Sequence, residues 1–317
     1  MENQARFPNG ATIFVLVLLP LLPLVMPATL ATQILIFAIA TLSVVLLFGS
    51  VGLLSFGQGL YLGLGAYLAG LLLRDIHLGL LPAILVATIG STALAIVLGA
   101  VIIRRRDLYF VMLTVAFAQM AYFAALALKD FTGGENGLSG LPRTFSLAGW
   151  TIASPLSLYI LAAVLFLLAF MIVQRVNASP IGTVFLAIRE NEARTAALGY
   201  NVTIYKVVAY ALAGGIAGLA GALHAAFLGF VPPTDIELEM SQRLVVMGLI
   251  GGVGSPAGAL MGACFYILAS EALSQIWARW MAIIALLIIA IVLYMPGGLW
   301  SVVGRIVSAA RPGKQHA

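Results

Sequence analysis

The stretch SPIGTVFLAIRENEARTAALGYNV, residues 179–202, is a charged island in a chain that is otherwise strongly apolar. Ser179 followed by Pro180 is typical of a helix that begins with a side-chain cap and has proline at its first helical position. Ala187 and Ile188 belong to an apolar helical face, and Gly199 is the kind of residue that ends a helix. The island therefore predicts a short amphipathic helix, a turn and a second helical stretch.

The composition of the whole chain sets its class. Of 317 residues, 62% are hydrophobic and only 9% are charged, and the mean hydropathy is +1.12. A soluble domain could not cover so much apolar surface, so the bilayer is the expected solvent. We expect a single transmembrane domain, residues 1–317, in which residues 129–154 form an outer loop and residues 179–202 form a cytoplasmic loop.

The apolar runs predict an all-α polytopic membrane protein with about ten transmembrane helices, some of them short or broken. Each span needs about 20 apolar residues to cross roughly 30 Å of hydrocarbon. The first run lacks a clear cleavage site and is interpreted as a retained helix. The eighth is short and is expected to be a tilted half-helix or a segment beside protein. The expected spans are Ala11–Met26, Leu30–Phe48, Gly52–Leu73, Leu80–Ile103, Leu108–Leu128, Pro155–Val173, Tyr205–Phe230, Arg243–Val253, Ala257–Gln275 and Arg279–Tyr294.

The basic residues predict the orientation of these spans. With both termini in the cytoplasm, eleven Lys or Arg residues fall inside and five fall outside, in agreement with the positive-inside rule. The net charge of +5 thus relates to membrane orientation, and no basic soluble face for nucleic acid is expected. The inner set is Arg6, Arg104, Arg105, Arg106, Arg175, Arg189, Arg194, Lys206, Arg305, Arg311 and Lys314; the outer set is Arg74, Lys129, Arg143, Arg243 and Arg279.

Glycine is concentrated inside the expected spans. The spacings Gly59–Gly63, Gly214–Gly218 and Gly254–Gly258–Gly262 are those that let helix backbones approach closely in lipid. The segments GLLSFGQGLYLGLGA (residues 52–66) and GLIGGVGSPAGALMGA (residues 248–263) share a Gly-Leu start and a Gly-Ala end. This similarity is weak evidence for an internal repeat of the kind found in transporters with interrupted helices.

No enzyme motif is present. HExxH, Gly-x-Ser-x-Gly and Gly-x-x-x-x-Gly-Lys-Ser/Thr do not occur, so we expect no catalytic residue, metal or cofactor. The single cysteine, Cys264, excludes an intrachain disulfide. His224 is the main ionisable residue within a span, either as a functional group or, more simply, in a hydrogen bond to a neighbouring helix. Because mid-span acids for ion coupling are missing, the energy for any transport must come from elsewhere.

The island is suited to contact with a partner. Its mixed charges and its alanines make it a weak lipid anchor, whereas a short amphipathic helix fits a groove on another protein. Passive packing at the membrane interface is the alternative.

The island resembles the cytoplasmic coupling loop of permeases in ATP-binding-cassette importers, specifically the branched-chain amino-acid permease family. The similarity extends through GLLSFGQGLYLGLGAY (52–67), DLYFVMLTVAFAQM (107–120), TGGENGLSG (132–140) and residues 248–263, and thus covers most of the chain. The TGG-x-NG motif is similar to that of the larger of the two permease subunits. The matching residues of the island are Ser179, Pro180, Gly182, Ala187, Ile188, Arg189, Asn191, Glu192, Ala196, Gly199 and Asn201, and Glu190 lies among them.

This resemblance implies a transport subunit of the inner membrane, not an enzyme. It implies a second permease subunit, two cytoplasmic ATP-binding subunits that hold the coupling loops, and an extracytoplasmic binding protein. ATP binding would move the loops and switch the helices between two states. A urea or short-amide permease of the same family, a stand-alone secondary carrier and a purely structural subunit are the alternatives. The substrate stays open.

A few polar residues within the spans are candidates for the transport pathway. Their alternative role is in hydrogen bonds between helices. They are Ser55, Gln58 and Tyr61 in the first glycine-rich segment and Thr114 and Gln119 in the fifth span.

Overall fold

The computed structural model describes residues 8–105, 107–142, 145–147, 150–152, 154–276, 279–295 and 297–302. Its elements are nearly all helical, which confirms the all-α membrane class. In chain order they are α1 (Pro8–Val25), α2 (Ala28–Val44), the π-helix η1 (Val45–Val51), α3 (Gln58–Arg74), α4 (Leu80–Ile102), α5 (Asp107–Ala127), α6 (Lys129–Thr132), η2 (Gly134–Asn136), β1 (Phe145–Leu147), β2 (Trp150–Ile152), α7 (Pro155–Ala178), α8 (Pro180–Glu190), α9 (Glu192–Ala197), α10 (Val202–Leu228), η3 (Pro233–Asp235), α11 (Leu238–Gly251), α12 (Pro256–Ile276) and α13 (Trp280–Tyr294).

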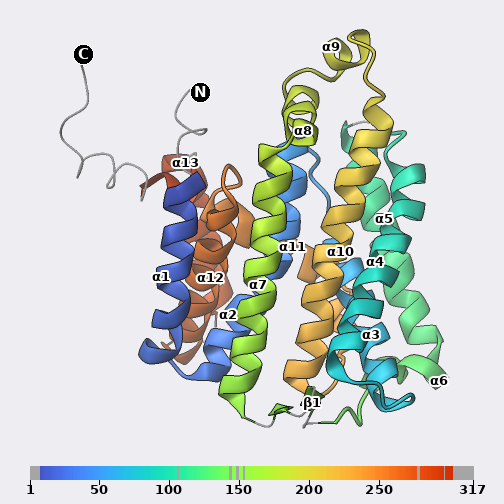
Figure 1. The fold of residues 1–317 in the computed structure, drawn as a ribbon, viewed down its shortest axis with the longest axis vertical. Coiled ribbons are helices and arrows are strands. Elements are labelled where there is room, and N and C mark those ends of the chain that lie inside the picture. Colours follow the sequence, from blue (N-terminus) through green and yellow to red (C-terminus); the bar gives the residue numbers. More distant parts are fainter. Residues whose placement is uncertain are drawn as a thin grey trace.

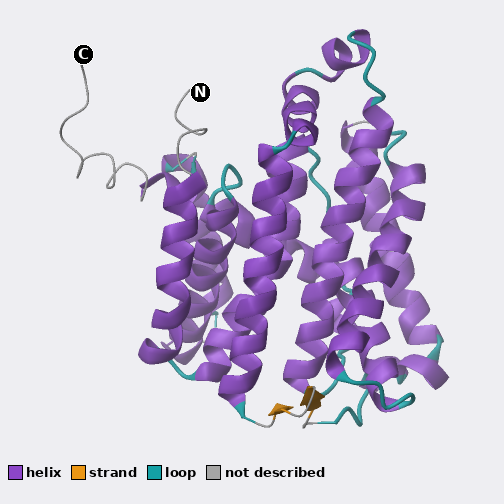
Figure 2. Ribbon diagram, in the orientation of Figure 1, coloured by secondary structure: helices purple, strands orange, loops and turns teal. Residues whose placement is uncertain are grey.

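The long helices lie side by side along one axis (Figure 1). The short helices α8 and α9 protrude at one end, at the top of the view, and we call this the coupling end. The antiparallel pair β1–β2 and α6 lie at the opposite end, which we call the hairpin end (Figure 2). The fold thus has two distinct ends separated by a helical slab.

Within the described part of the chain, six helical segments are long and apolar enough to cross a bilayer. They are residues 28–51, where α2 continues into η1, and α4, α5, α7, α10 and α12. The helices α1 and α13 contain shorter apolar runs, while α3 has 17 residues and α11 has 14. The chain is therefore an integral membrane protein, and the count of ten spans stays a prediction.

The α2–η1 segment and α10 form the centre of the bundle, because they are the most buried of the six spans. Small residues along α10 let α3 come close: a Cβ added to Gly221 would lie 1.8 Å from the carbonyl oxygen of Leu62. The helices α4 and α5 lie at the periphery and expose large apolar side chains such as Ile89 and Phe123. These exposed side chains are those that lipid would cover.

The third predicted span, Gly52–Leu73, was wrong at its beginning. The preceding helix ends at Val51, and Gly52 adopts φ +81, a left-handed conformation that glycine permits and that stops a helix. Residues 52–57, which we call the first break, are not helical, and α3 begins only at Gln58. Hydropathy does not mark such an interruption, since the residues on both sides of it are apolar.

The eighth predicted span corresponds to α11, which begins before the expected Arg243. Its 14 residues extend about 21 Å at 1.5 Å per residue, less than the thickness of the hydrocarbon. The helix packs against α12, α2 and α3, so it lies beside protein. Residues 252–255, which we call the second break, connect it to α12.

The glycines expected to pack helices lie at different places. Gly59 approaches Ser241 of α11, and Gly63 approaches Ile236. Gly258 and Gly262 lie on α12 against the backbone of α11.

Gly254 differs from these four, because it lies exposed in the second break and not in a helix. Of the three glycines at this spacing, Gly258 and Gly262 therefore pack helices and Gly254 does not.

Basic residues gather at the coupling end. Arg104 and Arg105 follow α4, and Arg105 lines a cavity there with residues of α8 and α9, whereas Arg74 and Lys129 lie at the hairpin end. Hydrogen bonds from Arg74 hold the pKa of the Asp75 carboxyl below its usual value. Of the basic residues used to predict orientation, Arg6, Arg106, Arg143, Arg305, Arg311 and Lys314 lie outside the described residues.

Candidate functional site

The island folds as its sequence predicts, into α8 and α9. The hydroxyl of Ser179 accepts a hydrogen bond from the backbone N–H of Gly182, and Pro180 occupies the first helical position. The side chain of Asn191 caps α9 in the same way, by accepting from the N–H of Arg194. Gly199 then takes φ +92 and ends the segment. Local capping chemistry is therefore sufficient to define both helices.

The inner face of α8 is apolar and closely packed. Val184, Phe185 and Ile188 are buried, and Ala187 is half-buried. A Cβ added to Gly182 would lie 2.4 Å from the carbonyl oxygen of Asn177, so only glycine allows α8 to fold back against the end of α7. The helix is thus fixed to the bundle and is not a free loop.

The outer face of α8 and α9 combines exposed apolar side chains with charges. Leu186 is 50% exposed and Leu198 is 72% exposed, although this end of the molecule also carries many charged groups. Apolar residues rimmed by polar ones are typical of a surface that another protein covers. We call this surface the coupling surface; it consists of Pro180, Ile181, Leu186, Glu190, Asn191, Ala193, Arg194, Ala196, Leu198 and Gly199.

Arg189 points inward from this surface. Its guanidinium donates a hydrogen bond to the carbonyl of Gly49 in η1, and its side chain lies over Gly52, where a Cβ would be 3.0 Å from the Arg189 Cγ. A cation beside the last carbonyls of a helix also has a favourable interaction with the helix dipole. Arg189 therefore connects α8 to the point where the first break begins.

Glu192 provides a second connection, between α9 and α10. Its carboxylate lies 2.7 Å from the Nζ of Lys206, whose side chain is only 7% exposed. A lysine this buried needs such a partner, because a buried unpaired charge is strongly destabilising. Two of the residues expected to act in coupling thus contact other elements of the bundle.

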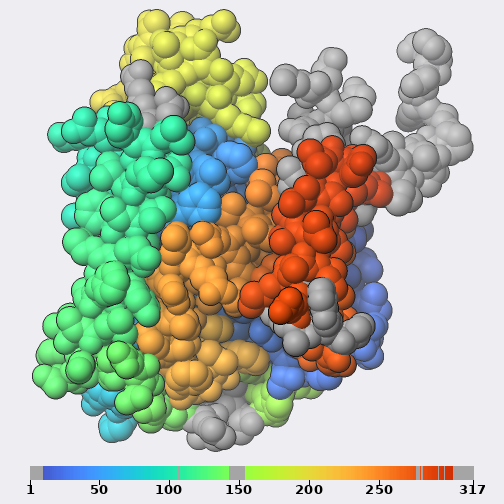
Figure 3. All heavy atoms as spheres, turned by 180° about the vertical axis from the view of Figure 1, so that it is seen from behind, coloured from blue at the N-terminus to red at the C-terminus, as the bar shows by residue number. Residues whose placement is uncertain are grey.

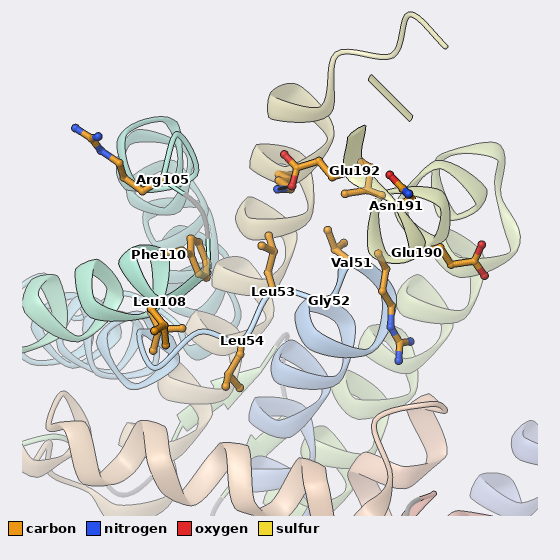
Figure 4. A pocket seen from close by; sticks show the side chains of 14 residues that line it. Val51, Gly52, Leu53, Leu54, Arg105, Leu108, Phe110, Glu190, Asn191 and Glu192 are labelled. Carbon is orange, nitrogen blue, oxygen red and sulfur yellow. Dashed lines mark hydrogen bonds and ion pairs between the residues drawn. The ribbon is translucent and has the colours of Figure 1, made fainter. Parts of the chain in front are cut away.

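A cavity of about 420 Å³ lies between the first break, the start of α5 and the α8–α9 unit (Figure 4). Apolar side chains of the break and of α5, such as Leu53 and Phe110, line one part of it, and Glu192 and Lys206 line another. The carboxylate of Glu190 points away from the other labelled side chains. The space-filling view from behind shows the blue atoms near residue 50 between α5, α8–α9 and α11 (Figure 3).

Three of the candidate pathway residues, Ser55, Gln58 and Thr114, lie at the N-terminal turn of α3. Ser55, Gln58, Tyr61 and Thr114 are all buried, and Gln119 is half-buried.

Hydroxyl groups satisfy the backbone donors of this turn. Thr114 Oγ1 accepts from the N–H of Phe56 at 3.2 Å, and Ser55 Oγ accepts from the N–H of Gly57 at 3.1 Å. Ser241 of α11 accepts from the N–H of Gly59 at 2.9 Å. A hydrogen bond between segments therefore accounts for Thr114, as the alternative interpretation held, whereas the hydrogen bond of Ser55 lies within the first break.

Other polar groups here are left without partners. Neither the nitrogen nor the oxygen of the Gln58 amide makes a hydrogen bond to any described residue, and the same is true of the Tyr61 and Tyr67 hydroxyls and of Gln119 Oε1. All of these atoms belong to α3 or α5. A buried polar group without a partner costs about 1–3 kcal/mol, so such groups usually mark a site where something binds.

The structure also pairs two residues that the sequence did not connect. His224 Nδ1 of α10 lies 2.9 Å from Asp235 Oδ2 of η3, and both side chains are buried. This confirms the simpler interpretation of His224, a hydrogen bond to a neighbouring element. The sequence gives no sign of this pairing, since Asp235 lies across a turn that sequence alone does not close. No group of three or more metal-ligating side chains occurs among the described residues.

Comparisons with known proteins agree with this arrangement. A family model described as "Branched-chain amino acid transport system / permease component" matches residues 26–293. The high-affinity branched-chain amino acid transport system permease protein LivM of Salmonella typhimurium is 28% identical over 291 residues, which cover 85% of this chain and 68% of that protein. The protein of the same name from Escherichia coli is 27% identical over the same shares.

More distant relatives carry other names. The ribose import permease protein RbsC of Escherichia coli is 32% identical over 143 residues, 42% of this chain and 43% of that protein. No solved structure matches the chain. Since the family model covers far more than half of the sequence, the chain belongs to the family of permease components of branched-chain amino acid transport systems.

Proposed function

We propose that this protein is the membrane-spanning permease subunit of an ATP-binding-cassette importer that moves branched-chain or related small amino acids into the cell. Family membership supports the transport role, and the names of the relatives LivM support the substrate class. The α8–α9 unit supports the energy source, because it offers a partner an exposed surface while its inner side chains contact the bundle. This connection between an outward surface and inward contacts is the observation that carries the proposal.

The partners follow from what this chain provides. One of two cytoplasmic ATP-binding subunits would cover the coupling surface, where Leu186 and Leu198 would be the apolar anchors. A second permease subunit would complete the pathway, and an extracytoplasmic binding protein would deliver the solute at the hairpin end. The basic residues at the coupling end favour a cytoplasmic position for that end, with both termini on the same side.

Contacts inside the chain give a route for the ATP-driven movement. A displaced α8 would pull on η1 through Arg189 and Gly49, and a displaced α9 would pull on α10 through Glu192 and Lys206. The moving parts would be the first break and the helices on each side of it, α2–η1 and α3. Alternating access would then be a rigid-body switch of these helices between two states.

Reconstitution of the full complex in proteoliposomes tests this function. We expect uptake of radiolabelled leucine that requires ATP, the binding protein and both ATPases. Leu186→Asp should abolish retention of the ATPase subunits in affinity purification, because it places a charge in an apolar contact. Ile76→Asp is the matched control, since Ile76 is 63% exposed between α3 and α4, away from the coupling end.

Two results would contradict the proposal. One is full uptake by this chain alone without an ATPase, which would indicate a stand-alone carrier. The other is unchanged retention of the ATPases by Leu186→Asp, which would mean that the coupling surface is not where they bind.

A further inference from the structure

We infer that the N-terminal turn of α3 recognises the transported solute inside the membrane, and that the side-chain amide of Gln58 binds it through both its nitrogen and its oxygen. The inference rests on the proposed transport function and adds to it a site and a chemical class of ligand.

Three backbone N–H groups of this turn already have hydrogen-bond partners. The N–H groups of Phe56, Gly57 and Gly59 donate to three hydroxyls that come from three different segments. The Tyr210 hydroxyl of α10 also approaches, 3.3 Å from where a Cβ on Gly57 would be. The turn is therefore a built polar site in which the amide of Gln58 lacks a partner, as does the hydroxyl of Tyr61 one helical turn further on.

Gln58 is 0% exposed, yet both polar atoms of its amide lack a hydrogen-bond partner among the described residues. A primary amide offers two donors and one acceptor, and buried groups of this kind are rarely left unmet. A second subunit cannot contact a side chain that has no exposed surface. The ligand must therefore be small enough to enter the bundle when it opens.

The charge of the site selects the class of ligand. No Asp, Glu, Lys, Arg or His side chain takes part in the hydrogen bonds of this turn, so a solute with a net charge would be poorly compensated. The N-terminus of α3 carries a partial positive charge that favours an anionic oxygen. An amino-acid zwitterion fits both conditions, because its carboxylate can accept from Gln58 Nε2 and its ammonium can donate to Gln58 Oε1. A short amide has a carbonyl acceptor and an N–H donor but no anionic oxygen, and a polyol likewise lacks one, so both satisfy fewer of these conditions than a zwitterion.

The position of Gln58 also connects the site to the coupling surface. The first break begins at Gly52, which Arg189 covers, and it ends at Gly57, next to Gln58. A movement of α8 would therefore reach the solute site through only six residues of chain.

Thiol labelling tests for a solute directly. In a Cys264→Ala background, Gln58→Cys in the complete complex should react with a small methanethiosulfonate during ATP turnover. Leucine at about ten times its Kd for this variant should slow the reaction by about tenfold, because the thiol reacts only while the site is empty. Gln33→Cys, a half-buried glutamine of α2, should show no protection. Absence of labelling in every state, or labelling that leucine does not slow, would overturn the inference.

Substitutions test the chemistry. Gln58→Leu removes both interactions, and Gln58→Glu removes the donor and adds repulsion toward a carboxylate. Each should lower leucine uptake by at least about tenfold, with basal ATP hydrolysis retained and Gln33→Leu unaffected. If Gln58→Leu does not assemble, Gln58→Glu decides, since it has nearly the same shape.

Uptake within about twofold of wild type by an assembled Gln58→Glu complex would contradict the site, because twofold is much less than one lost hydrogen bond. ATP-driven uptake of ribose but of neither leucine nor acetamide would contradict the ligand class. A wild-type complex that transports none of the three would instead contradict the proposed function itself.

Discussion

The two breaks of this molecule have similar backbone conformations but different surroundings. Each begins at a glycine with positive φ, Gly52 at +81 and Gly252 at +102, which stops the preceding helix. Three residues later each has a serine that accepts a backbone hydrogen bond two residues on: Ser55 from Gly57 at 3.1 Å, and Ser255 from Ala257 at 3.4 Å. A new helix starts directly afterwards in both.

The side chains around the breaks differ. The first break is held by Arg189 and leads to the unpartnered amide of Gln58. The second break is enclosed by backbone, since a Cβ on Gly252 would lie 2.3 Å from the carbonyl oxygen of Gly297. An interrupted helix by itself therefore gives only a backbone conformation. The side chains around the break decide whether a movement elsewhere in the protein can change it.

The second break also touches η1, the helix that ends where the first break begins. A Cβ added to Gly49 of η1 would lie 2.0 Å from the carbonyl oxygen of Val253 in the second break. Arg189 binds the carbonyl of the same Gly49. Gly49 is therefore a common contact of α8 and the second break, and it lies three residues before the first break.

The largest expected effect is on ATP hydrolysis, and it tests whether the first break has a role in coupling. Arg189→Gln should abolish leucine-stimulated ATP hydrolysis, because it disconnects α8 from the first break, while the protein still inserts and binds its partners. Glu192→Gln should act in the same direction through α10. Arg175→Gln is the control, since Arg175 is exposed near the end of α7 and is not part of the coupling surface. Stimulation by leucine that persists in Arg189→Gln would mean that coupling does not pass through the first break.

The second largest effect is on stability. Gly252→Ala should lower the free energy of unfolding by about 2–4 kcal/mol, from left-handed strain and overpacking against Gly297. Gly52→Ala has the same strain but meets only the flexible Arg189 side chain, so it should lose about 1–2 kcal/mol. Thermal unfolding in detergent measures both. A larger loss of stability for Gly52→Ala than for Gly252→Ala would contradict our view that the second break is the more rigidly packed of the two.

Disturbing the contact of Gly49 with Val253 should cause a smaller loss of stability than Gly252→Ala. Gly49→Ala introduces a Cβ against Val253 and should cost about 1–3 kcal/mol by overpacking. Gly248→Ala is the matched control, because its Cβ would meet only ordinary contacts at 3.5 Å or more. Equal melting temperatures for the two variants would show that η1 and the second break are not in close contact.

The smallest expected effect is that of removing the Ser255 hydroxyl, which we compare with removal of its counterpart at Ser55. Ser55→Ala leaves the buried N–H of Gly57 unmet and should cost about 1–3 kcal/mol at most, with a drop in leucine uptake. Ser255→Ala affects a half-buried turn with a longer hydrogen bond and should cost about 0.5 kcal/mol or less. Loss of uptake in Ser255→Ala alone would assign the solute site to the other break.

Sequence reasoning succeeded where structure is local. Ser179, Pro180 and Gly199 define α8 and α9 through capping and turn chemistry, which a few neighbouring residues determine. The same reasoning missed the start of α3, because hydropathy is equally high on both sides of Gly52. It also paired Gly52 with Gly248, whereas the structural correspondence is with Gly252; the internal repeat itself stays a prediction.

The candidate site was only partly predictable, because its polar residues can be found from the sequence but their contacts cannot. Gln58 and Thr114 attracted notice as polar residues within apolar runs, a signal that needs no tertiary information. The sequence could not show that a hydroxyl satisfies the N–H of Phe56 while the amide of Gln58 stays unmet. The inward contact of Arg189 and the pairing of His224 with Asp235 depend on packing between distant segments, which no local pattern encodes.

The shared position of Gly49 limits how the transporter can move. With Arg189 on its carbonyl and Val253 against its Cα, this residue connects α8 to the second break just before the first break begins, and we expect the three segments to move together. Partial or sequential opening of the two breaks would then be disfavoured, and the response to nucleotide should be all-or-none. Spin labels on α8 and on α12 should accordingly show two separate distance peaks whose weights change with ATP, and a single peak that shifts gradually would exclude this behaviour.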